Sequence, residues 1–542
     1  MKRLSKYILA GALICTSTAC SDFLDTFPSD ALVPNTAWKT ETDAQKFLIG
    51  CYSGWVDINE LFYWDASSDL GYCNFPYDPW KFMGNGSVTG STVYDFYNFY
   101  KIRMCNTFLE NIDQIPFQKE SDKQDMIAQV RTIRAYQYFD KNWWLGGIPI
   151  IENYESAEEA KVKRNSEKEV KDFVYKELDE AIPLLRKVPA KRGLIAQGTA
   201  LAIKMRSALY YGDYERALGS AQDIIDLGIY DLDPDYANLF MVEGQGSKEI
   251  IAALQYIDDV YTLYHIGMCF YNNAEGGWSG AVPLQNLVDI YEMDNGLTKE
   301  EAGDYYDPAH PYAHRDPRME MTILYPGRDW DGWIFNSLDK ECLNSDGEIV
   351  RNENHPTAGD NASDTGLSWA KYCGTGRDYY VDKFATNACP IVFRYAEVLL
   401  SYAEAANELD GPSEDIYEKL DRVRLRAGMP RVDRAKYNSK ETLRELIRRE
   451  RCVEFAGEGI RRADLVRWKD ANGKLLAETV LNIPAYRVEG TLDYSETEPG
   501  KRALVTGTTI LDERTFKPYH RYMPLPQKAM DSNPNLDQNP GY

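Results

Sequence analysis

The sequence predicts a mainly α-helical protein that contains tetratricopeptide-like helix pairs, interrupted by large irregular loop insertions. Three observations predict this fold. Residues 201–228 have the pattern of two amphipathic helices joined by a tight turn, and residues 395–428 repeat that pattern over 34 residues, the tetratricopeptide period. Two long segments, 58–100 and 268–390, lack sustained periodicity and are rich in Gly, Asn, Asp, Pro and aromatic residues. We therefore expect a helical scaffold whose variable surface lies on these two insertions.

The N-terminus predicts export and lipidation. A basic start precedes an apolar run, residues 7–15, which is too short to span a bilayer as a helix. Small residues then lead to Cys20, an arrangement typical of a lipobox. We expect residues 1–19 to be a signal peptide, Cys20 to carry the lipid anchor, and residues 20–30 to form a lipidated tether. The alternative is an ordinary secreted protein with an incidental cysteine at the cleavage site.

The charge of the chain limits its partners. The 542 residues carry a formal net charge of −23. Nucleic acid is excluded as a partner on this ground, because its phosphates require patches of Lys and Arg. Strongly anionic polysaccharides are disfavoured as well, although a local basic patch would override the total.

The N-terminal helical region shows two patterns that mark helix ends. Ser121 and Gln124 form a capping-box pattern, followed by apolar residues at helical spacing. Further on, the sequence Gly-Asp-Tyr at 212–214 separates two helical patterns, and Gly228 ends the second. Small residues on such a pair, including Ala217, allow two antiparallel helices to approach closely.

The C-terminal helical region shows the same punctuation. Gly411 and Pro412 break one predicted helix, and Ser413 caps the next, which Gly428 ends. A third helix is predicted to begin at Ser439 and to continue through residue 453. Its exposed face is expected to carry the i,i+4 ion pair Glu445–Arg449.

These patterns predict the organisation of the mature chain. Residues 31–267 form an N-terminal helical region that the insertion 58–100 interrupts. Residues 268–390 form the irregular ligand-facing insertion, and residues 391–542 form a C-terminal helical region and tail. Long irregular segments in a compact protein usually carry function, so the ligand site is expected on the two insertions.

Along nearly its whole length, the chain resembles the SusD/RagB family of Bacteroidetes outer-membrane nutrient-binding lipoproteins. The resemblance is carried by motifs that occur in the family's order: Thr-Glu-Thr-Asp-Ala at 40–44, Arg-Ala-Tyr-Gln-Tyr-Phe-Asp at 134–140 with Gly-Gly-Ile-Pro at 146–149, Arg-Tyr-Ala-Glu-Val-Leu-Leu at 394–400, Arg-Arg-Glu-Arg at 448–451, Asp-Leu-Val-Arg-Trp at 464–468 and Pro-Leu-Pro-Gln at 524–527. No single motif is decisive, but together they are specific.

The resemblance implies a fold of about four tetratricopeptide-like helix pairs that form a superhelical scaffold, packed against an irregular ligand-facing half made of the large loop insertions. It also implies a function and a place in the cell. Family members sit on the outer membrane, anchored by lipid and facing the cell surface. They capture oligosaccharides, or in some cases peptides, and work as a lid over a TonB-dependent, SusC-like transporter. The matched motifs are mainly scaffold residues, so Trp143, Trp144 and Trp468 are expected to pack in the protein or at an interface.

Two clusters of aromatic and polar residues are the candidate glycan site. Aromatic rings cover the C–H faces of a sugar, while amide, carboxylate and guanidinium groups pair with its hydroxyls. The first cluster contains Tyr72, Asn74, Tyr77, Trp80 and Asn85. The second contains Tyr271, Asn272, Asn273, Trp278, Arg328, Trp330 and Trp333. Trp80, Trp278, Trp330 and Trp333 are the leading candidates for ligand contact, with Trp64 and Trp369 in reserve. The competing interpretation is that these rings anchor long loops onto the helices.

Other classes of function find less support in the sequence. Asp329 and Asp331 lie beside aromatic residues like a glycosidase carboxylate pair, but hydrogen bonding to sugar hydroxyls explains them equally well. His310 and His314 are one near pair of potential metal ligands in a Pro- and Asp-rich stretch unsuited to helical ligation. We therefore expect no catalytic residue, metal or cofactor. A peptide- or glycopeptide-binding member of the family, and a lid without a ligand of its own, remain as alternatives.

Overall fold

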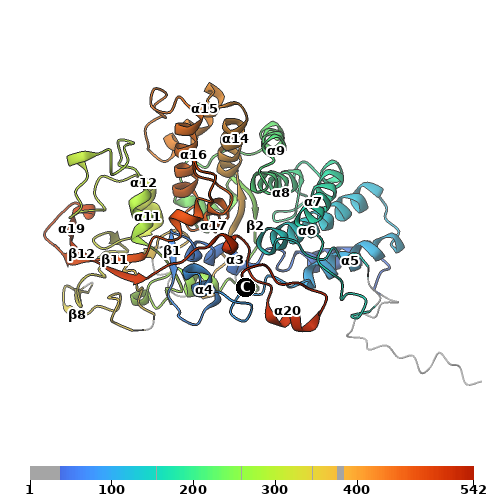
Figure 1. Cartoon of the computed structure of the whole chain (residues 1–542), viewed down its shortest axis with the longest axis horizontal. Helices are drawn as coiled ribbons and strands as arrows, with labels where there is room; N and C mark the ends of the chain where they lie inside the picture. The colour runs from blue at the N-terminus through green and yellow to red at the C-terminus, as the bar shows by residue number, and fades with distance from the viewer. Residues whose placement is uncertain (1–36, 154–155, 258, 345, 360, 375–383) are drawn as a thin grey trace, which may run out of the picture.

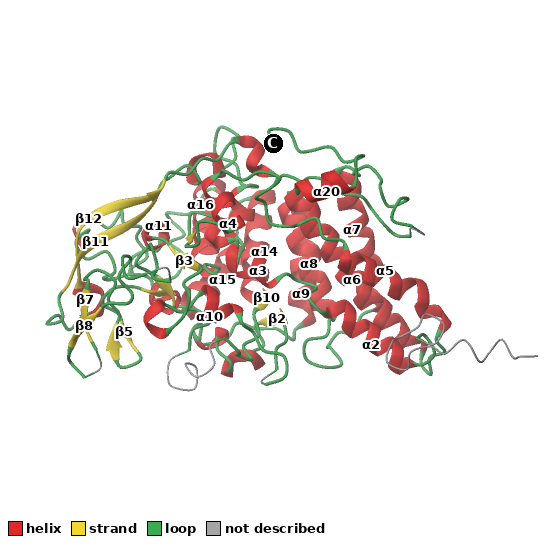
Figure 2. Ribbon diagram, turned by 90° about the horizontal axis from the view of Figure 1, so that it is seen from below, coloured by secondary structure: helices red, strands yellow, loops and turns green. Residues whose placement is uncertain are grey.

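Helices gather on one side of the molecule, and short strands with long loops occupy the other (Figures 1 and 2). The computed structural model describes residues 37–153, 156–257, 259–344, 346–359, 361–374 and 384–542. The predicted signal peptide, Cys20 and the tether lie outside these residues. In the described ranges, no helix is both long enough and apolar enough to cross a bilayer.

The helical side contains four packed helix pairs within the described residues. They are α2 (Glu41–Tyr52) with α5 (Tyr100–Asn111), α6 (Glu120–Leu145) with α7 (Glu167–Ala181), α8 (Gln197–Tyr210) with α9 (Tyr214–Leu227), and α14 (Tyr395–Asp410) with α15 (Glu414–Arg426). Helix α9 also packs against α14, so residues from both halves of the sequence form one helical body. The predicted helical, tetratricopeptide-like fold is therefore confirmed.

The predicted turns between helices are present. Asp213 caps α9, and Gly228 ends that helix at φ +66°, a left-handed conformation that glycine adopts without strain. Ser413 caps α15, with its hydroxyl accepting the Ile416 N–H. Helix α16 (Lys440–Glu454) begins after Ser439, as predicted.

Two details of the helix predictions are wrong. Helix α6 begins at Glu120, one residue before the predicted cap, so Ser121 lies inside the first turn and Lys119 is the N-cap residue. On α16, Glu445 pairs with Arg448 at 3.1 Å instead of Arg449. The Arg449 guanidinium instead pairs with the buried Glu292 at 2.6 Å. An unpaired carboxylate is destabilising when it is buried, whereas an exposed one such as Glu445 is solvated by water.

The irregular side is built from short elements. Its helices are α3 (Ile58–Tyr63), α4 (Pro79–Asn85), α10 (His265–Cys269), α11 (Gln285–Ile290) and α12 (Pro317–Thr322). Its strands are β1 (Gly71–Cys73), β3 (Ala281–Pro283), β4 (Ile323–Leu324), β5 (Asp329–Trp330), β6 (Trp333–Ile334), β7 (Glu341–Leu343), β8 (Ile349–Arg351) and β9 (Ser368–Trp369). Strand pairs β1–β3, β4–β9, β5–β6 and β7–β8 are all antiparallel.

The C-terminal part joins the two sides. It contributes α17 (Arg461–Leu465), α18 (Ala477–Val480), α19 (Pro499–Arg502), α20 (Gln527–Ser532) and the long hairpin of β11 (Ala485–Leu492) with β12 (Ala503–Asp512). Strand β10 (Ile391–Arg394) pairs with β2 (Ile250–Ala253) and leads directly into α14.

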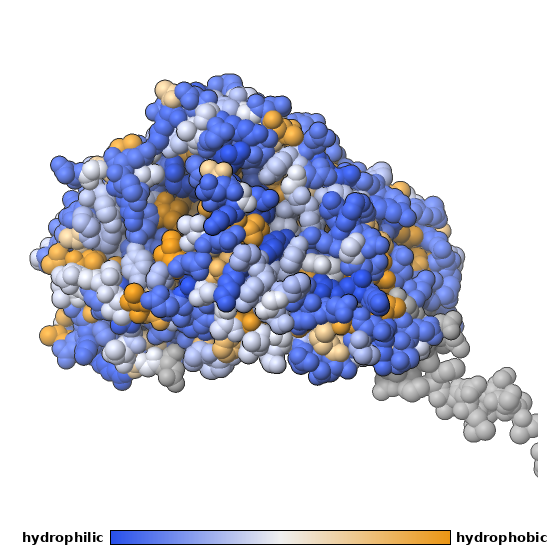
Figure 3. Space-filling model, viewed as in Figure 1, coloured by the Kyte–Doolittle hydropathy of each residue, from blue (hydrophilic) through white to orange (hydrophobic). Residues whose placement is uncertain are grey.

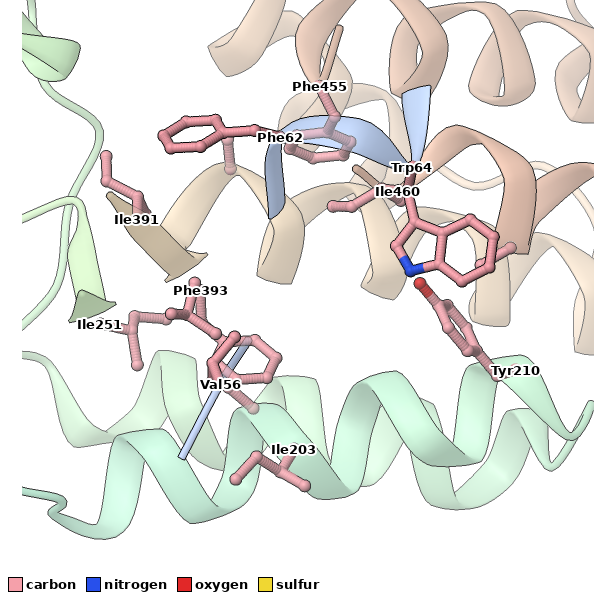
Figure 4. Packing of buried hydrophobic residues seen from close by; sticks show 14 of the residues in the cluster. Val56, Phe62, Trp64, Ile203, Tyr210, Ile251, Ile391, Phe393, Phe455 and Ile460 are labelled. Carbon is pink, nitrogen blue, oxygen red and sulfur yellow. The ribbon is translucent and has the colours of Figure 1, made fainter. Parts of the chain in front are cut away.

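One large apolar core connects most of these elements, and a small separate cluster of Tyr72, Val282, Leu284 and Ala485 packs between β1, β3 and β11. Figure 4 shows Val56 from the loop before α3, Trp64 from the first insertion, Ile203 from α8, Phe393 from β10 and Phe455 after α16 meeting in the large core. The face drawn in Figure 3 is mostly hydrophilic, as the acidic composition requires, with apolar residues in small separate groups.

The family-like motifs meet in a buried network of charges. Glu454, at 0% exposure, lies 2.7 Å from Arg394 and 3.1 Å from Arg318, and it also pairs with Arg426. Arg394 in turn contacts Glu249 and Glu458, each at 2.8 Å. These contacts tie β10, α12, α15 and α16 together, which explains why so many charged residues occur in predicted scaffold motifs.

A half-buried carboxyl pair between α3 and α6 predicts a pH dependence of stability. Glu60 on α3 and Asp140 on α6 share a hydrogen bond, and burial and the neighbouring carboxylate raise the pKa of Glu60 well above its usual range. A raised folded-state pKa contributes stability at low pH that is lost as pH rises through it. Glu60→Gln is therefore expected to lessen the fall of Tm between about pH 5 and pH 8. Thermal unfolding across that range tests this, and an unchanged pH slope would show that the pair holds no proton.

Candidate functional site: an aromatic surface

Most of the first predicted cluster is buried. Trp80 is only 2% exposed and packs against Trp64 (4.8 Å between ring centroids) and Tyr63 (5.8 Å). Tyr72 lies 5% exposed under the Lys81 ammonium group, which is 3.5 Å from the ring centroid. The prediction that the Trp80 ring contacts ligand is therefore replaced by a packing role, because no face of the indole is open.

The polar members of the first cluster hold loops in place. The Asn74 amide donates to the Ala362 carbonyl and accepts the Asp364 N–H, each at 2.9 Å, which fixes the loop before β9. Asn85 accepts the Ser87 N–H at 3.0 Å and so forms the turn after α4. Tyr77 differs from the others: its side chain is 76% exposed and stacks on Phe75 at 5.8 Å.

Part of the second cluster assembles inside the protein. Asn272 is 2% exposed and caps the short 3₁₀ helix Asn273–Glu275. Glu275 accepts the indole N–H of Trp330 at 2.9 Å, and the Arg328 guanidinium lies 5.0 Å from the Trp330 ring centroid. Asn272 and Trp330 both bond to Glu275, so the structure brings Asn272, Arg328 and Trp330 together, but Trp330 is only 5% exposed.

The remaining members also have local partners. Tyr271 is buried, and its hydroxyl donates to the Gly374 carbonyl. The Asn273 amide donates to the Glu353 carbonyl at 2.7 Å. Trp333 is half-buried and packs near Phe335 at 6.1 Å, across the β5–β6 hairpin from Trp330. The reserve candidates Trp64 and Trp369 are 3% and 2% exposed, so we assign them to packing.

Trp278 is exposed within a group of three rings. Its side chain is 37% exposed and lies 5.5 Å from Tyr264 and 5.4 Å from Phe384. Tyr264 is 39% exposed and lies 5.2 Å from Phe384. The three residues come from the start of α10, the loop before β3 and the loop before β10, so three separate segments present their rings together.

The β1–β3 pairing places the segment before Phe75 beside the segment that follows Trp278. The Asn74 N–H donates to the Gly280 carbonyl at 3.1 Å, which extends the ladder beyond Cys73 and Ala281. A Cβ atom at Gly280 would stand 3.0 Å from the Phe75 ring, so only glycine fits there without displacing the ring. Phe75 and Tyr77 therefore lie beside the segment that carries Trp278. We call Phe75, Tyr77, Tyr264, Trp278 and Phe384 the aromatic surface.

Backbone hydrogen bonds to α10 hold the segment that carries Trp278. The Trp278 N–H donates to the Gly267 carbonyl at 3.1 Å, and the Gly280 N–H donates to the Met268 carbonyl at 2.9 Å. Between them, Ser279 is fully buried with φ +46°, a strained conformation for a residue with a Cβ. The two hydrogen bonds to α10 hold the backbone on both sides of Ser279 in this conformation.

Sequence reasoning missed Phe75, Tyr264 and Phe384. Tyr264 follows Tyr256 and Tyr261 in a short aromatic run that could have marked it. Phe384 had no such signal, because only the fold brings it to Trp278. Tyr256 and Tyr261 themselves stack at 5.2 Å with their planes 4° apart.

The residues considered for catalysis or metal binding have other partners. Asp329 pairs with Arg502 at 2.6 Å, while Asp331 and Gly332 form the β5–β6 hairpin turn with φ +48° and +81°. His310 Nδ1 lies 3.0 Å from the Ala503 carbonyl, and His314 stacks on Tyr305 at 5.1 Å. Within the described residues, no group of three or more His, Cys, Asp or Glu could hold a metal ion.

Comparison with known proteins identifies the family. The model of the SusD family matches residues 248–542, more than half of the chain. The chain belongs to the SusD family. The SusD-like protein P25 of Formosa agariphila is 25% identical over 557 aligned residues, which cover 97% of this chain and 96% of that protein.

Solved structures of SusD-like proteins share the fold. A SusD-like carbohydrate binding protein from Bacteroides fragilis is 26% identical, with a TM-score of 0.80 over 93% of this chain and 100% of that chain. A second SusD-like protein from Bacteroides fragilis is also 26% identical, with a TM-score of 0.77 over 95% of this chain and 100% of that one. The similarity therefore includes the helical scaffold and the irregular side together.

Proposed function

We propose that this SusD-family chain is a cell-surface glycan-binding lipoprotein that captures oligosaccharides on its aromatic surface. The observation that carries the proposal is the exposed group of Tyr264, Trp278 and Phe384, with Tyr77 nearby on Phe75. Rings presented by three segments offer C–H-stacking platforms for consecutive sugar units along a shallow surface. The similarity to a SusD-like carbohydrate binding protein at 26% identity supports this assignment.

The delivery step is part of the same proposal. With Cys20 lipidated, the protein would be held at the outer surface of the outer membrane and pass its ligand to a TonB-dependent, SusC-like transporter. Tethering two components raises their effective concentration, so a weak single-site affinity suffices for capture. No catalytic step is required of this chain, and we assign hydrolysis of the glycan to other proteins.

Native gel retardation tests the proposal. The soluble chain without residues 1–20 is run through gels containing each of a panel of neutral and acidic polysaccharides. We expect retardation by one class of neutral glycan without release of reducing sugar. Release of reducing sugar would contradict a purely binding role.

Retardation by no glycan would favour the alternatives. Peptide binding is then tested by titrating mixed peptides into the same protein. A lid without its own ligand is recognised when neither glycans nor peptides bind in the absence of the transporter.

A further inference from the structure

A cavity of about 580 Å³ lies where the helix pairs meet the C-terminal part, and it shares no lining residue with the aromatic surface. Trp143 on α6 and Tyr211 after α8 line it from one side. Arg448 on α16, Trp468 after α17 and Arg521 line it from the other. Its volume is that of sites that enclose small molecules.

Two of the arginines that line the cavity are neutralised by carboxylates. Arg444 forms a bidentate pair with Glu408, and this hydrogen bonding raises the pKa of Arg444. Arg467 pairs with Glu404 and Asp464, and these carboxylates raise its pKa even though burial opposes the charge. The charges of Arg444 and Arg467 are therefore already balanced by carboxylates of the protein.

Arg448 and Arg521 are compensated far less. Arg448 contacts Glu445 at 3.1 Å, but that carboxylate side chain is 64% exposed and so is shared with solvent. The nearest carboxylate oxygen to Arg521 in the described structure belongs to Glu167, at 3.9 Å. Burial lowers the pKa of both arginines, because no carboxylate outweighs the loss of hydration. Two under-compensated cations thus face one cavity in a chain of net charge −23.

Each of these arginines is held by a tryptophan ring. The Arg521 guanidinium carbon lies 3.6 Å from the Trp143 ring centroid, and that of Arg448 lies 5.2 Å from the Trp468 ring centroid. Both indoles are 3% exposed and therefore fixed by packing. Stacking orients the guanidinium groups, whose N–H edges match the two oxygens of a carboxylate or phosphate.

We propose that this cavity binds a small hydroxylated anion, the class that includes acidic monosaccharides and sugar phosphates. Arg448 and Arg521 would hold the anionic group. Tyr214 and Asp470, which also line the cavity, would receive hydroxyls of the ligand. This site is independent of glycan binding at the aromatic surface, which requires no charge.

Calorimetric titration of the mature chain with glucuronate, glucose 6-phosphate and glucose tests the proposal. We expect at least one anion to bind and glucose to give no signal. Arg448→Gln and Arg521→Gln should each weaken the anion about tenfold or more, because each removes a charge-assisted hydrogen bond. The matched control is Arg431→Gln, whose side chain is 65% exposed outside the cavity.

The outcomes distinguish a carboxylate ligand from a phosphate ligand, and binding in the cavity from binding at the aromatic surface. Binding of glucuronate alone identifies a carboxylate sugar, and binding of glucose 6-phosphate alone identifies a phosphate. Trp278→Ala should leave this binding unchanged, which distinguishes the cavity from the aromatic surface. The proposal is overturned if neither anion binds at millimolar concentration, if glucose binds as tightly, or if a folded Arg448→Gln or Arg521→Gln variant keeps the wild-type affinity. Circular dichroism establishes which variants are folded. One folded variant, either Arg448→Gln or Arg521→Gln, is enough for the test.

Discussion

Replacing Trp278 by alanine is expected to weaken glycan binding about tenfold or more, since truncating a central aromatic contact residue typically costs more than about 1 kcal/mol. The Trp278 ring is 37% exposed and touches Tyr264 and Phe384, so its loss would remove the middle of the aromatic surface. Stability should change little, because the ring contributes little to the core. Affinity for the glycan found by gel retardation, measured together with Tm, checks both expectations.

Tyr100→Ala is the matched control for this variant. Tyr100 is another exposed aromatic residue, 61% accessible, at the start of α5 on the helical side. Its removal should leave affinity unchanged. If Trp278→Ala and Tyr100→Ala bind equally well, the glycan does not occupy the aromatic surface.

Replacing Glu454 by alanine is expected to lower the free energy of unfolding by about 3–5 kcal/mol. Glu454 is fully buried and pairs with Arg318, Arg394 and Arg426, so the substitution leaves three buried guanidinium groups without a shared anion. Chemical denaturation measures the loss. A change below about 1 kcal/mol would contradict a stabilising role for the network.

The same network predicts behaviour in acid. Burial alone would oppose ionisation of Glu454, but Arg426, Arg394 and Arg318 outweigh it and hold the pKa of this carboxyl well below its usual range. A depressed folded-state pKa contributes stability above the unfolded value that is lost as pH falls, so Glu454→Ala should flatten the acid side of the stability profile. Asp172→Ala is the control: it breaks the exposed Lys168–Asp172 pair on α7 and should cost no more than about 0.5 kcal/mol.

The helical scaffold could be predicted because its signals are local. Gly411 ends α14 through its backbone conformation, and Ser413 begins α15 through its side-chain hydroxyl, which caps the helix. Both effects act within a few residues and do not depend on distant parts of the fold. The error at Ser121 arose because α6 begins one residue earlier, after Lys119, which makes no side-chain capping hydrogen bond. A favourable cap residue therefore does not fix the first residue of a helix by itself.

The site could be predicted only by region. Trp80 and Tyr77 have the same kind of surroundings in the sequence, yet Trp80 is 2% exposed and Tyr77 is 76% exposed. The difference follows from the packing of Trp80 against Trp64, which the sequence does not reveal. Likewise, Phe384 reaches Trp278 through the fold of the irregular side, a contact between distant segments that has no local signal.

Hydroxyl-radical footprinting with and without the bound glycan tests the central claim most directly. Mass spectrometry would follow the oxidation of Tyr77, Tyr264 and Trp278, which are exposed on the aromatic surface, and of Tyr100, which lies elsewhere. We predict that saturation with glycan strongly protects Trp278 and Tyr264 from oxidation. Tyr77 should be protected only by longer oligosaccharides, and Tyr100 should stay reactive. Unchanged oxidation of Trp278 and Tyr264 at saturating glycan would contradict the assignment of the binding site.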